Sequence, residues 1–186
     1  MAYLTVKNLD DDEFLDTHYI IFCTKKGIIK KTSLRAYSRP RQNGIIALSI
    51  NDDDDLLEVK LTNGNCDIML GTSSGRAIRF EEQQVRPMGR GATGVRGIRV
   101  KDNGIDQVVG MVCIDRDKEA PTILTVSQKG YGKRTALTEY RSINRGGKGV
   151  TTMNLTEKTG ELIALKEVTS DNGFCLLYTS DAADED

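Results

Sequence analysis

The sequence predicts an all-β protein, built as a propeller-like array of about three four-stranded blades. Short runs of Val, Ile, Leu and Thr recur along the 186 residues, and 18 glycines punctuate them. Runs bounded in this way are typical of short strands joined by tight turns. Helical periodicity is hard to find, and we expect at most one helical turn, near Phe80–Val85. The strands recur with a period of 48 to 55 residues, which is typical of propeller blades.

Each repeat opens with a predicted β-hairpin around a turn glycine. Gly27, Gly75 and Gly130 each follow an apolar run and precede a strand that carries basic residues. Glycine readily adopts the positive φ that hairpin turns require. The apolar runs are 19–22, 68–70 and 123–126, and the basic strands are 28–31, 76–79 and 131–134.

Each repeat continues with a basic loop, a second glycine and two further predicted strands. The second glycines are Gly44, Gly94 and Gly149, and the runs that they open are 45–48, 95–98 and 150–153. A fourth run follows an acidic turn, at 56–61, 108–114 and 162–168. We expect the four runs of each unit to form one sheet, with its acidic turn on the side away from the basic segments.

Both ends of the sequence read as incomplete units. Residues 1–18 are predicted to end a preceding blade, with a closing strand and an acidic turn in Leu4–Leu15. The blades are predicted at 19–66, 67–121 and 122–172. Residues 173–186 are predicted to be the truncated start of a next blade, with a tail that we expect to be disordered or artefactual.

The positive charge of the chain is concentrated in three windows. The chain has 26 Lys and Arg against 27 Asp and Glu, yet 20 of the basic residues lie in 25–41, 76–101 and 129–148. Only Glu81, Glu82 and Glu139 are acidic there. Scattered charges would solvate exposed strands equally well, whereas segregation by repeat position predicts a surface for the phosphates of nucleic acid.

The residues predicted to contact DNA phosphates come from the basic strands, from their turns and from the loops that follow. They are Lys25, Lys26, Lys30, Lys31, Arg35, Arg39, Arg41, Arg76, Arg79, Arg86, Arg90, Arg96, Arg99, Lys129, Lys133, Arg134, Arg141, Arg145 and Lys148.

Other kinds of site fit the sequence poorly. The four cysteines lack CxxC spacing and lie mostly in apolar runs, so we expect reduced core thiols and no metal site. The GxGxxG match at 89–94 precedes a β-like run rather than a helix, which disfavours a dinucleotide cofactor. Asp52–Asp55 and Asp10–Glu13 lack the ligand spacing of a calcium loop and read as solvated turns. His18 lies beside an apolar run and is expected to pack rather than to catalyse.

Two segments carry a specific resemblance to a known family. Val85–Gly89 with Thr93–Ile98, and Gly130–Thr135, closely resemble the C-terminal β-pinwheel domain of the DNA gyrase A subunit. The resemblance covers roughly residues 1–175, which look like blades three to five. Asn144–Gly149 is similar to the family's Gln-Arg-Arg-Gly-Gly-Lys-Gly box, but its register belongs to a later blade.

The resemblance implies a DNA-wrapping segment of an ATP-dependent type II topoisomerase that introduces negative supercoils. It implies double-stranded DNA as a partner, and the A-subunit homodimer and the gyrase B subunit in the full protein. No catalytic residue or cofactor is expected in this segment, whereas the holoenzyme would use ATP and magnesium. A bacterial cytoplasmic, nucleoid-associated location is expected, without membrane contact, since no apolar stretch reaches 18 residues and no signal peptide is evident.

Two alternatives remain open. The A-type subunit of topoisomerase IV has a homologous C-terminal domain, which would bind DNA without supporting negative supercoiling. A propeller-like scaffold for protein interactions would use acidic and apolar edges instead of the basic segments.

Overall fold

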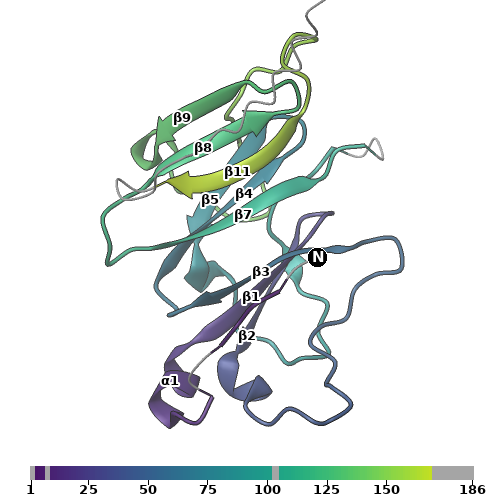
Figure 1. Cartoon of the computed structure of the whole chain (residues 1–186), viewed down its shortest axis with the longest axis vertical. Coiled ribbons are helices and arrows are strands. Elements are labelled where there is room, and N and C mark those ends of the chain that lie inside the picture. The colour runs from purple at the N-terminus through teal and green to yellow at the C-terminus, as the bar shows by residue number, and fades with distance from the viewer. Residues whose placement is uncertain (1–2, 7–8, 102–104, 169–186) are drawn as a thin grey trace, which may run out of the picture.

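The computed structural model of the chain describes residues 3–6, 9–101 and 105–168. Within these ranges, three antiparallel sheets follow one another as blades, as Figure 1 shows. The predicted all-β class and the propeller-like arrangement of blades are confirmed.

Blade one has the strand order β3-β1-β2-β6. Its strands are β1 (Tyr19–Thr24), β2 (Ile28–Ser33), β3 (Leu56–Thr62) and β6 (Val95–Arg96), and a 3-10 turn, η1 (Leu34–Tyr37), follows β2. The hairpin β1–β2 turns at Gly27, whose φ of 81° is the positive value predicted for this position.

Blade two repeats this plan with the order β10-β5-β4-β7. Its strands are β4 (Cys66–Thr72), β5 (Arg76–Glu81), β7 (Val108–Asp115) and β10 (Val150–Thr151). The 3-10 turn η2 (Glu82–Gln84) follows β5, where one helical turn is predicted. Blade three has the order β11-β8-β9, with β8 (Thr122–Ser127), β9 (Gly132–Ala136), a 3-10 turn η3 (Leu137–Glu139) and β11 (Leu162–Val168).

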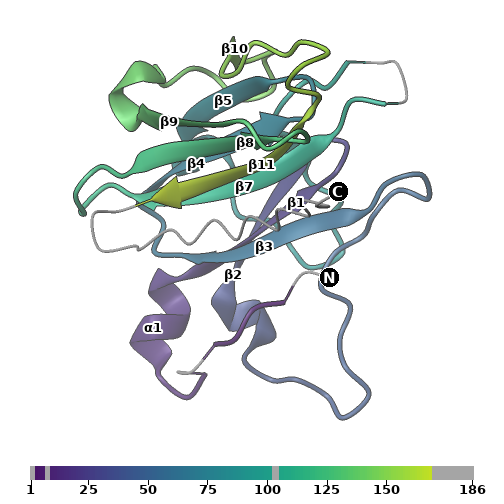
Figure 2. The same ribbon diagram turned by 45° about the horizontal axis from the view of Figure 1, so that its top comes forward.

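The third runs of the second and third repeats pair outside their own units, which corrects the expectation of self-contained sheets. Val95 lies opposite Ile29 in blade one, and Val150 lies opposite Ala77 in blade two. Figure 2 shows β10 beside β5. The preceding glycines permit this exchange, because a Cβ at Gly149 would lie 2.4 Å from the carbonyl oxygen of Ala77. Ile45–Leu48 forms no strand in the part of the chain that the structure describes.

Two cores lie between the three blades, because β4 is buried on both faces. Ile68 and Leu70 pack with Ile21 and Ile29 of blade one, whereas Met69, on the opposite face, packs with blade three. Cys23 and Cys66 are buried free thiols and Cys113 is a half-buried one, as the sequence predicts for these three.

The N-terminal segment contains a helix, and the described residues of the predicted closing strand and acidic turn, Leu4–Leu15, form no strand, which corrects that expectation. Helix α1 (Asp12–Thr17) begins at Asp11, whose side chain accepts a hydrogen bond from the amide of Phe14 at 3.1 Å. Acidic residues in the first turn of a helix suit its positive end, so the acidic cluster starts a helix rather than a turn. Leu15 packs on Phe22 and Leu34 at the outer face of blade one. His18 stacks on Phe14, in the packing role predicted for it. The predicted tail at 173–186 lies outside the described residues.

Candidate nucleic-acid interface

In each blade, a backbone hydrogen bond joins the hairpin turn to the segment that precedes β3, β7 or β11. The amide of Lys25 donates to the carbonyl of Asp55 at 2.9 Å, and the corresponding pairs are Ser73 with Gln107 and Gln128 with Glu161, both at 2.8 Å. The acidic turn of blade one therefore lies beside basic residues. The expectation that acid and base occupy opposite sides of a blade is wrong here.

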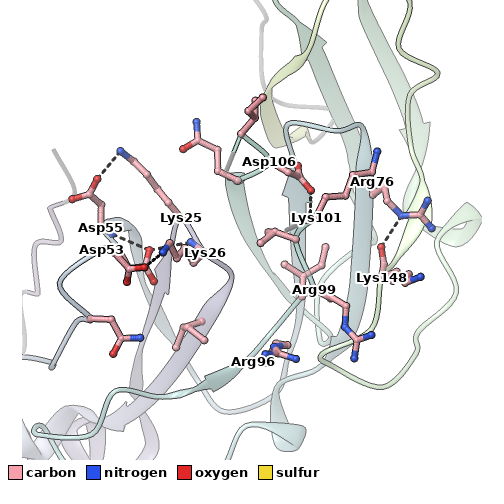
Figure 3. Close-up of a pocket in the computed structure, with 17 residues that line it drawn as sticks. Lys25, Lys26, Asp53, Asp55, Arg76, Arg96, Arg99, Lys101, Asp106 and Lys148 are labelled. Carbon is pink, nitrogen blue, oxygen red and sulfur yellow. Dashed lines mark hydrogen bonds and ion pairs between the residues drawn. The ribbon is translucent and has the colours of Figure 1, made fainter. Parts of the chain in front are cut away.

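A cleft of about 1030 Å³ lies beside these turns of blades one and two. Figure 3 shows basic side chains that reach it from several segments. They come from all three sequence windows, and they are Lys25, Lys26, Arg76, Arg96, Arg99, Lys101 and Lys148. Acidic side chains also line the cleft, at Asp53, Asp54, Asp55 and Asp106.

Backbone contacts between segments fix the basic side of the cleft. The guanidinium of Arg76 donates to the carbonyls of Lys148 and Gly149, both at 2.8 Å. The amide of Arg99 donates to the carbonyl of Gly147 at 2.8 Å. The blade exchange through β6 and β10 thus brings windows two and three together. Lys101, absent from the predicted contacts, is exposed in this cleft and belongs to the second window.

The other side of the cleft is neutralised. Lys25 Nζ lies 2.9 Å from Asp55 Oδ2, and Lys26 forms an ion pair with Asp53. Lys26 holds the pKa of Asp53 below its ordinary value, through a hydrogen bond and through its charge. The free positive charge of the cleft therefore lies toward Arg96, Arg99 and Lys148.

The predicted phosphate contacts of Lys30 and Lys31 require correction. Only 1% of Lys30 and 4% of Lys31 is exposed, because both faces of β2 are covered. Lys30 donates to backbone carbonyls, and Lys31 Nζ lies 2.7 Å from Glu82 Oε1. Ammonium groups bound in this way are held inside the protein and cannot reach a phosphate at its surface.

Arg79 is likewise a structural residue. Its Nε donates to Asp67 at 2.8 Å, and its Nη1 donates to the carbonyls of Leu137 and Tyr140 in blade three. Arg116 pairs with the other oxygen of the same carboxylate at 3.1 Å. Arg79 therefore joins blades two and three, which corrects its predicted phosphate contact.

Two further predicted residues are engaged within the protein. Arg35 pairs with Asp16 and Asp12, and hydrogen bonds to these carboxylates raise the pKa of Arg35 above its ordinary value. Arg145 donates to the carbonyls of Gln84 and Arg96, at 2.9 and 3.1 Å. Arg35 thereby fastens α1 to η1, and Arg145 fastens its own loop to η2 of blade two and to β6 of blade one.

The remaining predicted residues form the outer basic surface, and their contact with DNA stays a prediction. Arg90 is half-buried. The predicted residues that are exposed and make no ion pair with another described residue are Arg39, Arg41, Arg86, Arg96, Arg99, Lys129, Lys133, Arg134, Arg141 and Lys148.

The described residues contain no group of three or more His, Cys, Asp or Glu side chains that could hold a metal ion. No helix in the same part of the chain is long and apolar enough to cross a bilayer.

Comparison with known proteins gives one consistent family. The family described as DNA gyrase C-terminal domain, β-propeller, matches residues 18–63, 67–115 and 121–169. The DNA gyrase A subunit of Staphylococcus epidermidis is 44% identical over 168 residues, which are 90% of this chain and 18% of that protein. The same subunit of Lawsonia intracellularis is 42% identical, over 90% of this chain and 20% of its own length. The chain thus spans about a fifth of the curated relatives that it matches.

Solved structures agree with the fold. The C-terminal domain of DNA topoisomerase IV superposes with a TM-score of 0.76 at 27% identity, and covers 86% of this chain and 49% of that one. The DNA gyrase A C-terminal domain gives 0.73 at 26% identity, over 87% of this chain and 52% of the other.

Proposed function

Because the chain belongs to the family of DNA gyrase C-terminal domains with a β-propeller fold, we propose that it binds duplex DNA and wraps it along its blades. The observation that carries the proposal is the cleft beside the turns of blades one and two. Basic side chains from all three windows meet there, although the windows are far apart in the sequence.

The chemistry of this surface suits the DNA backbone. Lysine and arginine bind phosphates chiefly through charge, and the release of condensed counterions makes such binding independent of sequence. Arg96, Arg99 and Lys148 supply that charge without an acidic partner among the described residues. The affinity is therefore expected to be similar for all duplex sequences and to fall steeply with salt.

Wrapping follows from the repetition of blades. Bending a short duplex costs several kcal/mol, so a bent path needs contacts distributed along an arc. Blades one, two and three are joined by exchanged strands and by two apolar cores. Such an array is stiff enough to present successive basic loops along a curve.

In the full-length protein we place this segment in the A subunit of a DNA gyrase, an ATP-dependent type II topoisomerase. The segment would hold a wrapped duplex for strand passage by the A-subunit homodimer with the B subunit, in the bacterial cytoplasm. The curated relatives are gyrase subunits, whereas the solved structures include a topoisomerase IV domain of similar fold. Topoisomerase IV is therefore the second candidate, and it differs in the expected topological outcome.

Duplex binding at several salt concentrations tests the first half of the proposal. The log–log slope should be about −0.9 for each phosphate neutralised. Arg99→Glu should weaken binding to all sequences about tenfold at roughly 0.1 M salt. Lys118→Glu is the matched control, because Lys118 is an exposed lysine in the β7–β8 turn, away from the cleft. No binding at low salt would support the protein-interaction scaffold instead.

Ligation of nicked circular DNA in the presence of the chain tests the second half. A wrapped duplex shifts the linking number of the sealed circle, and the shift should grow with protein concentration. Tight binding without any shift would contradict wrapping and favour the topoisomerase IV alternative.

A further inference from the structure

Lys30 is a buried cation that lacks an acidic partner among the described residues. Its ammonium group donates to the carbonyl of Ala47 at 3.0 Å and to the carbonyl of Arg90, and lies 5.7 Å from the ring centroid of Phe22. Burial lowers the pKa of Lys30 below its ordinary value. Burying a charge with only carbonyl partners is costly, so the residue is poorly explained by packing.

The repeat shows that the fold itself does not need this lysine. Counting from the turn glycines, the position of Lys30 in β2 corresponds to Ile78 in β5, which is buried in the apolar core. In β9 the same position is Lys133, which is exposed. An apolar side chain therefore satisfies this strand position where it is buried, and the ammonium of Lys30 has another role.

The ammonium of Lys30 contacts the loop Arg86–Gly94 through the carbonyl of Arg90. At its base, the amide of Met88 donates to the carbonyl of Lys31 at 2.8 Å. At its tip, a Cβ at Gly89 or Gly91 would meet nothing within 4 Å, so packing holds the tip weakly. The tip is fixed from blade one by Lys30, through Arg90 O, and by the hydroxyl of Ser49, which donates to Gly91 O at 3.0 Å.

The matching loop of the next repeat, Arg141–Gly149, is held by its own arginine. Arg145 donates from its amide to Gln84 Oε1 and from its guanidinium to Gln84 O, both at 2.9 Å. In the first loop the corresponding residue is Arg90, and its backbone carbonyl accepts a hydrogen bond from Lys30, which lies outside the loop in β2. The side chain of Arg90 is thereby left available for a ligand, whereas that of Arg145 is used within the protein.

We propose that Lys30 is a positioning residue for DNA binding, which fixes the tip of the loop Arg86–Gly94 so that Arg86 and Arg90 reach the phosphates. The inference rests on the proposed function, since it assumes that these arginines meet DNA. Lys30 itself touches no ligand and acts through the backbone carbonyl of Arg90.

The decisive variant is Lys30→Met in the full chain, with Lys118→Met as control for the loss of one positive charge. Lys30→Met should bind duplex DNA about fivefold more weakly, and the salt slope should fall by about 0.9 for each phosphate that the loop no longer neutralises. Arg90→Ala should also weaken binding, and the loss in the double variant should be smaller than the sum of the two single losses, because both changes remove the contact of Arg90 with DNA. If Lys30 had only a structural role, Lys30→Met would leave the salt slope unchanged, and its effect would add to that of Arg90→Ala.

Hydrogen exchange of the DNA-free protein tests the positioning independently of DNA. Lys30→Met should speed exchange of the amides in the loop Arg86–Gly94 and leave those of β4 unchanged. If Lys30→Met unfolds, Ser49→Ala replaces it, because Ser49 is exposed and holds the same tip. A folded variant with parental slope, affinity and loop exchange would overturn the inference. Failure of the parent chain to bind DNA would overturn the proposed function instead, and the exchange result would still stand.

Discussion

Lys31 Nζ lies 2.7 Å from Glu82 Oε1, in an ion pair whose side chains are only 6% and 0% exposed. Lys31 belongs to β2 of blade one, whereas Glu82 starts the 3-10 turn of blade two. The same carboxylate accepts hydrogen bonds from the hydroxyl of Thr62 at 2.8 Å and from the amide of Cys66 at 3.2 Å. One buried carboxylate therefore joins β2 and β3 of blade one to β4 of blade two.

Breaking this pair should destabilise the protein strongly. Glu82→Gln keeps an acceptor for Thr62 but leaves the ammonium of Lys31 buried without its counter-charge. Loss of one partner of a buried pair typically costs about 3–5 kcal/mol. Urea unfolding measures this loss as a lower midpoint with an unchanged slope.

The double variant Lys31→Met/Glu82→Gln is the control for this prediction. Removing both charges leaves no unpaired ion, so at least half of the lost free energy of unfolding should return. Equal stability of the single and double variants would contradict a buried-charge cost. The fold accepts an apolar residue at this position of the repeat, because Leu137 corresponds to Glu82 in blade three.

Alanine should destabilise the protein by different amounts at two turn glycines that share one conformation, because only one of them packs against the segment that follows β10. Gly75 and Gly130 have φ values of 76° and 81°, so alanine brings similar backbone strain to both. A Cβ at Gly75 would lie 2.5 Å from Met153 O, whereas at Gly130 nothing lies within 4 Å. Gly75→Ala should therefore lower the free energy of unfolding by about 1–3 kcal/mol more than Gly130→Ala. Thermal unfolding of both variants checks this, and equal losses would show that the turn strain alone matters.

The sequence could predict the hairpins because local chemistry determines them. A turn glycine between two apolar runs specifies a positive φ, and Gly27, Gly75 and Gly130 all have one. The exchange of strands between blades could not be predicted in this way. The alternation of apolar and polar residues indicates a strand but does not identify the strand that it pairs with. The strands β6 and β10 each have only two residues, which is too short for such a pattern. The helix α1 did leave a signal, because Asp11 and the acidic first turn are typical of a helix start.

Charge segregation indicated the candidate basic residues, whose contact with DNA stays a prediction, but it could not show which of them are exposed in the folded protein. Composition cannot distinguish a lysine on a surface from one in a buried pair. β2 is covered on both faces, so its adjacent Lys30 and Lys31 both point into the protein. The pairing of Lys26 with Asp53 was equally hidden, because the two lie 27 residues apart.

The salt dependence of DNA binding should separate free from paired cations of the cleft. Arg99 is exposed and has no acidic partner among the described residues, so Arg99→Ala should lower the log–log slope by about 0.9. Lys26 is already paired with Asp53, so Lys26→Ala should lower it less, since a paired cation releases fewer counterions. Titration of one duplex at several salt concentrations measures both slopes. The reverse order would show that DNA displaces Asp53 from Lys26.

The buried thiols should make the protein less stable at alkaline pH. Burial raises the pKa of the Cys23 thiol above its ordinary value of 9.0, so this thiol stays protonated in the folded chain. In the unfolded chain it ionises above about pH 9, and the unfolded state then binds fewer protons, so the free energy of unfolding falls as pH rises. The contribution of Cys23 is fully present below about pH 9 and should shrink by about 1.4 kcal/mol by about pH 10.

Urea unfolding at about pH 7.5 and about pH 10 checks this prediction. Between the two pH values, the free energy of unfolding should fall less for Cys23→Ala than for the parent chain, because any cavity cost of the variant is the same at both. An identical loss in the two proteins would mean that Cys23 ionises alike in the folded and unfolded states.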